Sequence, residues 1–65
     1  MKQYLYFIWQ VDSTDYTSKW FNFRLEDVIY ERGNDGFSFI NAIDGTFINW
    51  RLITQFRLHE VKEVT

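Results

Sequence analysis

Residues 37–50 read FSFINAIDGTFINW, and this stretch decides the fold. Asp44-Gly45 stands between two runs in which apolar and polar residues alternate. An Asp-Gly pair in this setting is the strongest short-range hairpin signal, because a type I′ turn needs positive φ angles, which Asp tolerates and Gly adopts freely. We therefore expect a strand over residues 37–43 that turns at Asp44-Gly45 and pairs with a strand over residues 46–50.

A second Asp-Gly pair lies just before this hairpin, in the turn Gly33-Asn34-Asp35-Gly36. It predicts that strand 37–43 also pairs backward, with a strand over residues 28–32. Residues 20–25 alternate in the same way, and Glu26-Asp27 then interrupts the pattern as a kink or bulge would. This alternation puts Phe21, Phe23 and Leu25 on one face of that segment.

The segment around residue 28 also allows a helix. Leu25, Val28 and Ile29 have the i, i+3, i+4 spacing of one helical face, and Gly33 is a suitable stop. The β-branched and aromatic residues at 28–30 favour the strand. We keep a short helix near residues 25–32 as the alternative.

The two ends of the chain also predict strands. Residues 3–11 are rich in aromatic and β-branched types, and we expect Leu5, Phe7 and Trp9 to face the core because the opposite face carries tyrosine hydroxyls. A polar loop is expected over residues 12–19. After a short irregular or 3₁₀ turn at about 51–54 comes a last strand, over 55–61, and then a frayed tail at 62–65. The residues of the last strand expected to face inward are Phe56 and Leu58, whereas Val61 is out of phase with them.

These strands predict an all-β chain that folds as a single small domain over residues 1–65. Because the strands are apolar on both faces, a flat sheet would leave one apolar face exposed to water. Curling into a barrel buries that face and removes most of the unpaired edges. We expect five to six antiparallel strands in a partly closed barrel, similar in architecture to SH3-like and Sm-like barrels. The alternative is an α+β fold with the one short helix near residues 25–32.

The amino-acid composition narrows the classes of function that we expect. The 65 residues contain no cysteine and no proline, and fourteen of them, or 22%, are Phe, Tyr or Trp. Since rings in this number are hard to enclose in so small a core, some are expected at an interface. The net charge of −2 does not favour nonspecific binding to duplex DNA. No signal peptide or membrane-spanning run is apparent, so we expect a cytoplasmic protein without a membrane partner.

The sequence gives little support for a catalytic or metal-binding site. His59 is the only histidine and, like Arg57, is expected on a solvent-facing strand position. There is no cysteine nucleophile, and Glu26 and Asp27 would point to opposite faces of an extended chain. We expect no enzyme, no metal, no cofactor and no small-molecule substrate.

Protein binding is the function that the sequence favours. Trp, Tyr and Arg are the usual anchors of interfaces. The partner is expected to be another protein or a second copy in a dimer, as for an inhibitor or regulator from a bacterium or phage. The candidate interface residues are Trp9, Trp20, Arg24, Tyr30, Trp50 and Arg51.

Single-stranded nucleic acid is the alternative partner. Small barrels bind single strands by stacking bases on exposed rings beside basic side chains. The rings that would serve are Trp20, Tyr30, Phe39 and Trp50, and the arginines are Arg24, Arg32, Arg51 and Arg57.

Overall fold

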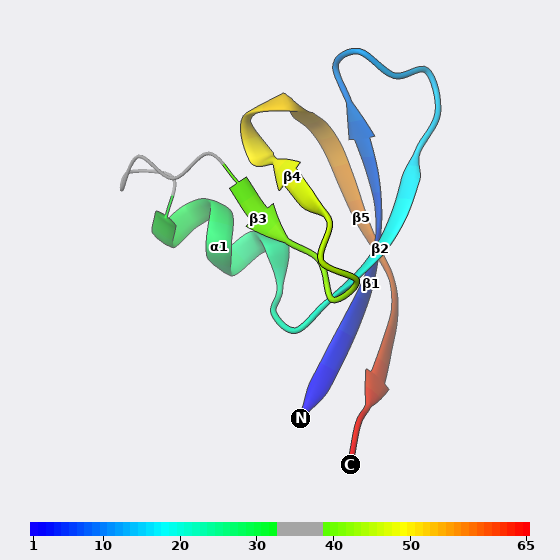
Figure 1. Ribbon diagram of the computed structural model, residues 1–65, viewed down its shortest axis with the longest axis vertical. Coiled ribbons are helices and arrows are strands. Elements are labelled where there is room, and N and C mark those ends of the chain that lie inside the picture. The colour runs from blue at the N-terminus through cyan, green and yellow to red at the C-terminus, as the bar shows by residue number, and fades with distance from the viewer. Residues whose placement is uncertain (33–38) are drawn as a thin grey trace.

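The computed structural model describes residues 1–32 and 39–65, and for residues 29–32 it describes the backbone alone. The turn expected at residues 33–36 and its backward pairing lie outside the described residues. Figure 1 shows the elements of the fold. In chain order they are β1 (Lys2–Gln10), β2 (Thr17–Phe21), α1 (Leu25–Arg32), β3 (Phe39–Asn41), β4 (Phe47–Asn49), the 3₁₀ helix η1 (Trp50–Leu52) and β5 (Ile53–Glu63).

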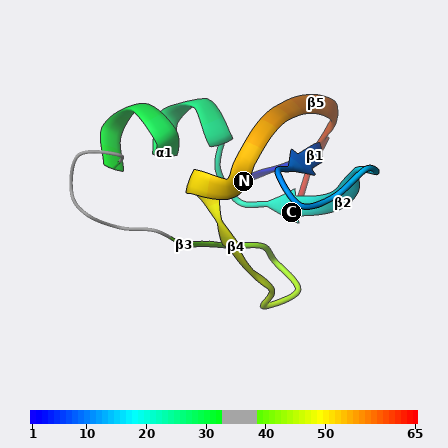
Figure 2. The same cartoon turned by 90° about the horizontal axis from the view of Figure 1, so that it is seen from above.

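The described part of the chain is mostly β, and its strands form two antiparallel sheets. One sheet has three strands in the order β2-β1-β5, with β1 in the middle, and the other is the β3–β4 hairpin. Figure 2 shows α1 and the hairpin as separate layers beside the three-stranded sheet. Both contribute buried side chains to one core, which lies on a single face of that sheet.

The core is built around Tyr6 of β1 and Phe21 of β2, neither of which has any exposed surface. Their rings meet edge to face at 6.0 Å, and Phe56 of β5 meets Tyr6 in the same way at 5.8 Å. The other fully or nearly fully buried residues are Ile8, Leu25, Ile40, Ala42 and Ile48. Phe56 and Leu58 pack against this core, as predicted for the last strand.

The face of β1 that enters the core is the opposite of the predicted one. Tyr6 and Ile8 are buried, so Leu5, Phe7 and Trp9 lie on the outer face of the three-stranded sheet. The prediction assumed that tyrosine hydroxyls seek water. The hydroxyl of Tyr6 instead donates to the carboxylate of Glu26, at 2.9 and 3.2 Å, and accepts the N–H of Leu25 at 3.2 Å. A buried hydroxyl with such partners costs little to enclose.

Residues 25–32 form the helix α1, so the expected strand over residues 28–32 is wrong and the alternative is confirmed. Glu26-Asp27 is the first turn of this helix, where carboxylates are favoured by the positive end of the helix dipole. The hydroxyl of Tyr6 satisfies one of the N–H groups that a helix leaves unpaired at its start. Among the described residues, no helix has the length and apolar content needed to cross a membrane.

The hairpin predicted from Asp44-Gly45 is confirmed, but its turn is of another type. Only Gly45 has a positive φ angle, of 89°, whereas a type I′ turn would need one at Asp44 as well. Ala42 accepts the N–H of Gly45 at 3.1 Å and donates its own N–H to Thr46 at 2.9 Å. This is a three-residue loop in which a glycine with positive φ closes the turn.

β5 is longer than expected and contains two bulges. It pairs with β1 as far as Lys2–Glu63, so the expected tail at 62–65 begins as strand. The register shifts where Leu5 pairs with Glu60 but Tyr6 pairs with Leu58, which leaves His59 as an extra residue. A second shift leaves Thr54 extra.

The bulge at His59 explains why Val61 looked out of phase. Val61 pairs with Tyr4, which shares its sheet face with the buried Tyr6, because the extra residue resets the alternation. The polar segment 12–19 is likewise only partly a loop, since β2 begins at Thr17. The predicted 3₁₀ turn is confirmed in η1.

The hairpin turn is fastened to the edge of β2. Ile43 donates its N–H to the carbonyl oxygen of Trp20 at 2.9 Å. Next to this bond, the ammonium of Lys19 lies 2.8 Å from Asp44 Oδ2 and 3.3 Å from Thr46 Oγ1. These contacts link the two sheets at the end of the hairpin.

Replacing Asp44 with asparagine is expected to lower the stability at neutral pH more than at acid pH. The hydrogen bond from Lys19, and then the N–H of Thr46, hold the pKa of Asp44 well below its usual 3.8. A carboxyl group with a lowered pKa stabilises the fold above that usual value and loses this contribution as the pH falls through its folded pKa.

Thermal unfolding of the natural chain and of Asp44→Asn at about pH 7 and about pH 2 measures this effect. The gap between their midpoints should shrink in acid. Asp12→Asn, in the exposed connection after β1, serves as the control and should shift neither midpoint. An equal gap at both pH values would show that the Lys19–Asp44 pair does not act through its charge.

Candidate functional site

The six candidate interface residues lie in three separate places. Trp9 of β1 and Trp20 of β2 are on the outer face of the three-stranded sheet, opposite the core. Trp50 and Arg51 belong to η1 at the end of the hairpin. The two others are Arg24, just before α1, and Tyr30, which lies in α1 and whose side chain is outside the described residues.

The outer sheet face carries a stack of rings that runs across the strands. The ring of Phe7 lies 4.6 Å from that of Tyr16 and 4.4 Å from that of His59, the latter at an interplanar angle of 21°. These spacings resemble the distance between neighbouring strands. The ring of His59 is therefore stacked on that of Phe7, and the ring of Tyr16 lies tilted beside it.

The two tryptophans of this surface also use their rings within the chain. Trp9 contacts Tyr16 at 5.6 Å, and the ammonium of Lys62 lies 4.4 Å from the ring centre of Trp20. Both tryptophans are only partly exposed as a result. Much of this surface is therefore engaged in contacts within the chain, while Tyr16 remains 48% exposed.

Arg24 takes part in a network that fixes α1 to the sheet. Its Nε lies 3.2 Å from Glu26 Oε2, and the same carboxylate accepts the hydroxyl of Tyr6. The hydrogen bond to Glu26 raises the pKa of the Arg24 guanidinium further above its usual value. Arg24 is therefore committed to a structural contact and lies apart from the η1 pair.

The β3–β4 hairpin exposes two phenylalanines, which the six candidates did not include. Phe39 of β3 is 59% exposed and Phe47 of β4 is 67% exposed. In the hairpin, Phe39 lies opposite Asn49 and Phe47 lies opposite Asn41. We call these four residues the hairpin surface. No other phenylalanine in the described part of the chain is exposed to this extent.

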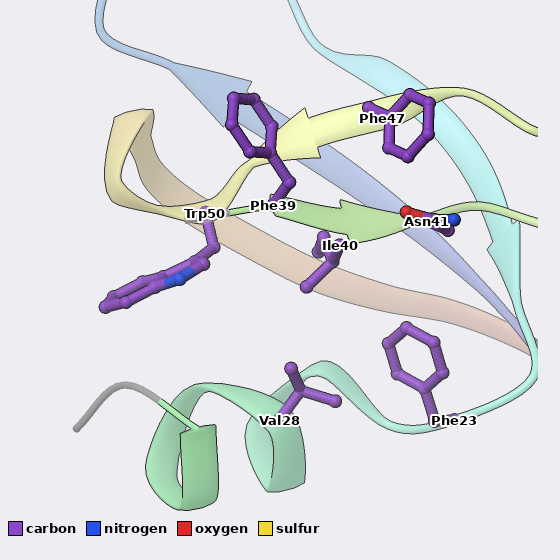
Figure 3. Close-up of a pocket in the computed structure, with 7 residues that line it drawn as sticks. All are labelled: Phe23, Val28, Phe39, Ile40, Asn41, Phe47 and Trp50. Atoms are coloured by element: carbon purple, nitrogen blue, oxygen red, sulfur yellow. The ribbon is translucent and has the colours of Figure 1, made fainter. Parts of the chain in front are cut away.

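A hollow of about 470 Å³ adjoins the hairpin surface, between the hairpin and α1. In Figure 3, Ile40 and Val28 point into the space between β3 and α1, whereas the rings of Phe39 and Phe47 project from the other side of the hairpin ribbons. The lining is aromatic and aliphatic apart from one amide, that of Asn41, which suits an apolar side chain with one polar contact. The lining residues are Phe23, Val28, Phe39, Ile40, Asn41, Phe47 and Trp50.

Trp50 stands at the rim of this hollow and also lines a second one, of about 400 Å³, with residues of η1 and β5. The guanidinium of Arg51 lies 5.5 Å from the centre of the Trp50 ring. η1 itself is capped by Asn49, whose Oδ1 accepts the N–H of Arg51 at 3.0 Å. One residue of the hairpin surface therefore positions the Trp50–Arg51 pair, and two of the six predicted residues belong beside this surface.

The sequence contains a signal for the exposed phenylalanines. Both hairpin strands read Phe-Ile-Asn, at residues 39–41 and 47–49. Strand alternation puts Phe and Asn on one face and Ile on the other. Because an asparagine amide is costly to bury without partners, the isoleucine face enters the core and each phenylalanine goes outward with its asparagine. Ile40 and Ile48 are buried accordingly.

Within residues 1–32 and 39–65, no three His, Asp or Glu side chains lie together so as to hold a metal ion. Comparison with known proteins found no family model, no curated protein and no solved structure that matches the chain.

Proposed function

We propose that the protein is a non-enzymatic accessory protein that binds another protein through the hairpin surface, with Trp50 and Arg51 at its border. The exposure of Phe39 and Phe47 is the observation that carries this proposal. Two exposed phenylalanines beside an apolar hollow form a surface whose burial by a partner is favourable, because that burial removes apolar area from water.

The magnitudes support a specific contact. An enclosed phenylalanine ring removes roughly 150–250 Å² from water, worth several kcal/mol at about 25 cal/mol per Å² before the cost of association. The hollow of about 470 Å³ has room for one large apolar side chain of a partner. Asn41 and Asn49 give the surface hydrogen-bonding groups that would orient the contact.

A single-stranded nucleic acid is supported less well as the partner. On the outer sheet face, the ammonium of Lys62 lies over the ring of Trp20 and would compete with a base for that side of the ring. Phe39 and Trp50 lie at the open end of the hairpin, whereas Trp20 borders its turn, so these three rings do not line one hollow. The net charge of −2 adds no general attraction for phosphate.

We also propose that the architecture is a partly closed barrel of the SH3-like or Sm-like kind. The bond from Ile43 to Trp20 joins the hairpin to β2, and Val11 donates its N–H to Leu52 at 2.9 Å, joining η1 to the end of β1. These bonds between neighbouring elements support a partial closure of the sheets. The position of a 3₁₀ helix between the last two strands also fits this architecture.

The double variant Phe39→Ala/Phe47→Ala is expected to stay folded and to lose partner binding. Both side chains are more than half exposed, so their removal costs the fold little, while the interface loses its two anchors and more than tenfold in affinity. Immobilised natural chain, double variant and a control would each be exposed to extract of the source cell, and the retained proteins identified by mass spectrometry. The matched control is Val11→Ala, an exposed apolar residue away from the hairpin.

Proteins retained by the natural chain and by Val11→Ala but lost from the double variant would support the proposal. Equal retention by all three would contradict it. A parallel filter assay with labelled single-stranded oligonucleotides at low salt covers the alternative, because retention that falls steeply with salt would favour nucleic acid as the partner.

A further inference from the structure

β5 has a long edge that the described part of the chain leaves unpaired. The strand runs over eleven residues, Ile53–Glu63, and its only strand neighbour among the described residues is β1. An unpaired edge of this length presents N–H and C=O groups to any strand of matching pattern. The side-chain pattern of β5 decides which strand can pair with this edge.

The backbone direction near the end of β5 can be assigned. Val64 donates its N–H to the carbonyl oxygen of Met1 at 2.8 Å, so the backbone groups of Val64 point toward β1. These groups alternate in direction along an antiparallel strand. The N–H and C=O of Lys62 therefore also point toward β1, and those of Val61 point to the free edge.

The side chains on either side of Val61 are complementary to those of a second, antiparallel copy of the same segment. Glu60 pairs with Leu5 and Lys62 pairs with Gln3, which puts both charged side chains on the outer sheet face. Val61 lies between them on the other face and is 45% exposed. When Glu60-Val61-Lys62 is set antiparallel against a second copy, each Glu60 faces a Lys62 and the two valines face each other.

We propose that two copies of the chain associate through this edge of β5, about a two-fold axis at Val61. The outward N–H and C=O of Val61 exchange hydrogen bonds with those of the partner's Val61, and two Glu60–Lys62 pairs flank them once each Lys62 ammonium leaves the ring of its own Trp20. A shift of the register by one residue would bring side chains of opposite sheet faces together, and the Glu60–Lys62 pairs would be lost. The side-chain pattern therefore favours this pairing over others. A strand of another sequence would leave Glu60 and Lys62 without oppositely charged partners, and this limits nonspecific pairing at the edge.

The dimer goes beyond the proposed function and leaves the hairpin surface free. Joining β5 to β5 extends the three-stranded sheet into one of six strands, with the two outer sheet faces side by side. Phe39 and Phe47 lie on the other sheet and take no part. Failure of the dimer therefore does not bear on partner binding, and failure of partner binding does not bear on the dimer.

A single introduced cysteine tests the axis directly, because the natural chain contains none. Val61→Cys brings two thiols together at the axis, where the Cα atoms of a hydrogen-bonded pair lie about 5.5 Å apart, a spacing that a disulfide accepts. Under mild oxidation this variant should form a covalent dimer on the order of tenfold faster than the exposed control Val11→Cys. Equal rates for the two variants would overturn the proposal.

A charge swap tests the register without an added thiol. Sedimentation across protein concentration should show the natural chain as a dimer at high concentration. Glu60→Lys and Lys62→Glu each set like charges face to face twice and should raise the dissociation constant roughly tenfold. The double swap Glu60→Lys/Lys62→Glu restores both pairs and should restore the dimer.

Two results of the charge swap would overturn the proposal. The first is a natural chain that stays monomeric at every concentration. The second is a double swap that associates no better than either single variant. Phe39→Ala/Phe47→Ala should dimerise like the natural chain, and its dissociation would overturn the assignment of the interface to β5.

Discussion

Replacing Phe21 with alanine is expected to remove a large part of the protein's stability. The ring of Phe21 has no exposed surface and touches those of Tyr6 and Phe23. Removing such a ring typically costs about 3–5 kcal/mol, because the burial is lost and a cavity remains. A chain of this length has only about 3–10 kcal/mol of stability in total. Urea unfolding followed by tryptophan fluorescence measures the loss.

Phe47→Ala is the matched control for this prediction. It removes the same ring from a side chain that is 67% exposed, so its urea midpoint should stay close to that of the natural chain. If Phe21→Ala is too unfolded to titrate, Phe21→Leu keeps part of the volume and should give a measurable loss of about 1 kcal/mol. Equal effects at Phe21 and Phe47 would contradict the placement of the core.

Tyr6→Phe is expected to cost about 1–3 kcal/mol although it removes a single oxygen atom. That hydroxyl holds the N–H of Leu25 and the carboxylate of Glu26 inside the structure, and a buried polar group left without its partner pays its full desolvation cost. Chemical unfolding monitored by circular dichroism gives the difference. α1 should fray first, because this contact attaches its start to the sheet.

Tyr4→Phe is the control, since Tyr4 is on the same face and makes no hydrogen bond through its hydroxyl within the described residues. Its stability should change by less than about 0.5 kcal/mol. Burial, and then Glu26, raise the pKa of Tyr6 to about 12. The contribution of Tyr6 is therefore complete below about pH 10 and is lost as the pH rises toward 12, so the gap between Tyr6→Phe and the natural chain should narrow there. A gap unchanged by alkali would count against this network.

The elements that the sequence predicted correctly are those with strong local signals. Asp44-Gly45 placed the hairpin, and the aromatic run over residues 3–11 placed β1. The type of turn was missed because a three-residue loop and a two-residue loop share the Asp-Gly signal. The face of β1 was missed because the partners of Tyr6 come from α1, far along the chain, and alternation alone does not reveal them.

The helix shows how tertiary contacts override propensity. Val28 and its neighbours favour a strand, yet the start of α1 is stabilised by the hydroxyl of Tyr6 and by first-turn carboxylates. The spacing of Leu25 and Val28 gave the correct alternative. Choosing between the two required knowing that a buried hydroxyl from β1 would reach Leu25.

The candidate site was predicted only in part, because the sequence showed surplus rings without showing which would be outside. Trp50 and Arg51 border the hairpin surface, whereas Trp9 and Trp20 pack on the outer sheet face. Tryptophan was favoured for its frequency in interfaces. The two phenylalanines of the Phe-Ile-Asn segments are more exposed, and the asparagine beside each was the better guide.

The bulge at His59 bears on how the chain tolerates insertions and deletions. His59 is the extra residue between Leu58 and Glu60, so a chain that lacks it would keep Glu60 and Val61 on their present faces, in an uninterrupted ladder with β1. The loss would fall on the ring that covers Phe7. Deleting a residue from the regularly paired part of β5 would instead reverse the alternation of the strand and turn its apolar side chains outward. Length variation among descendants of this chain is therefore expected to concentrate at the two bulge residues, Thr54 and His59.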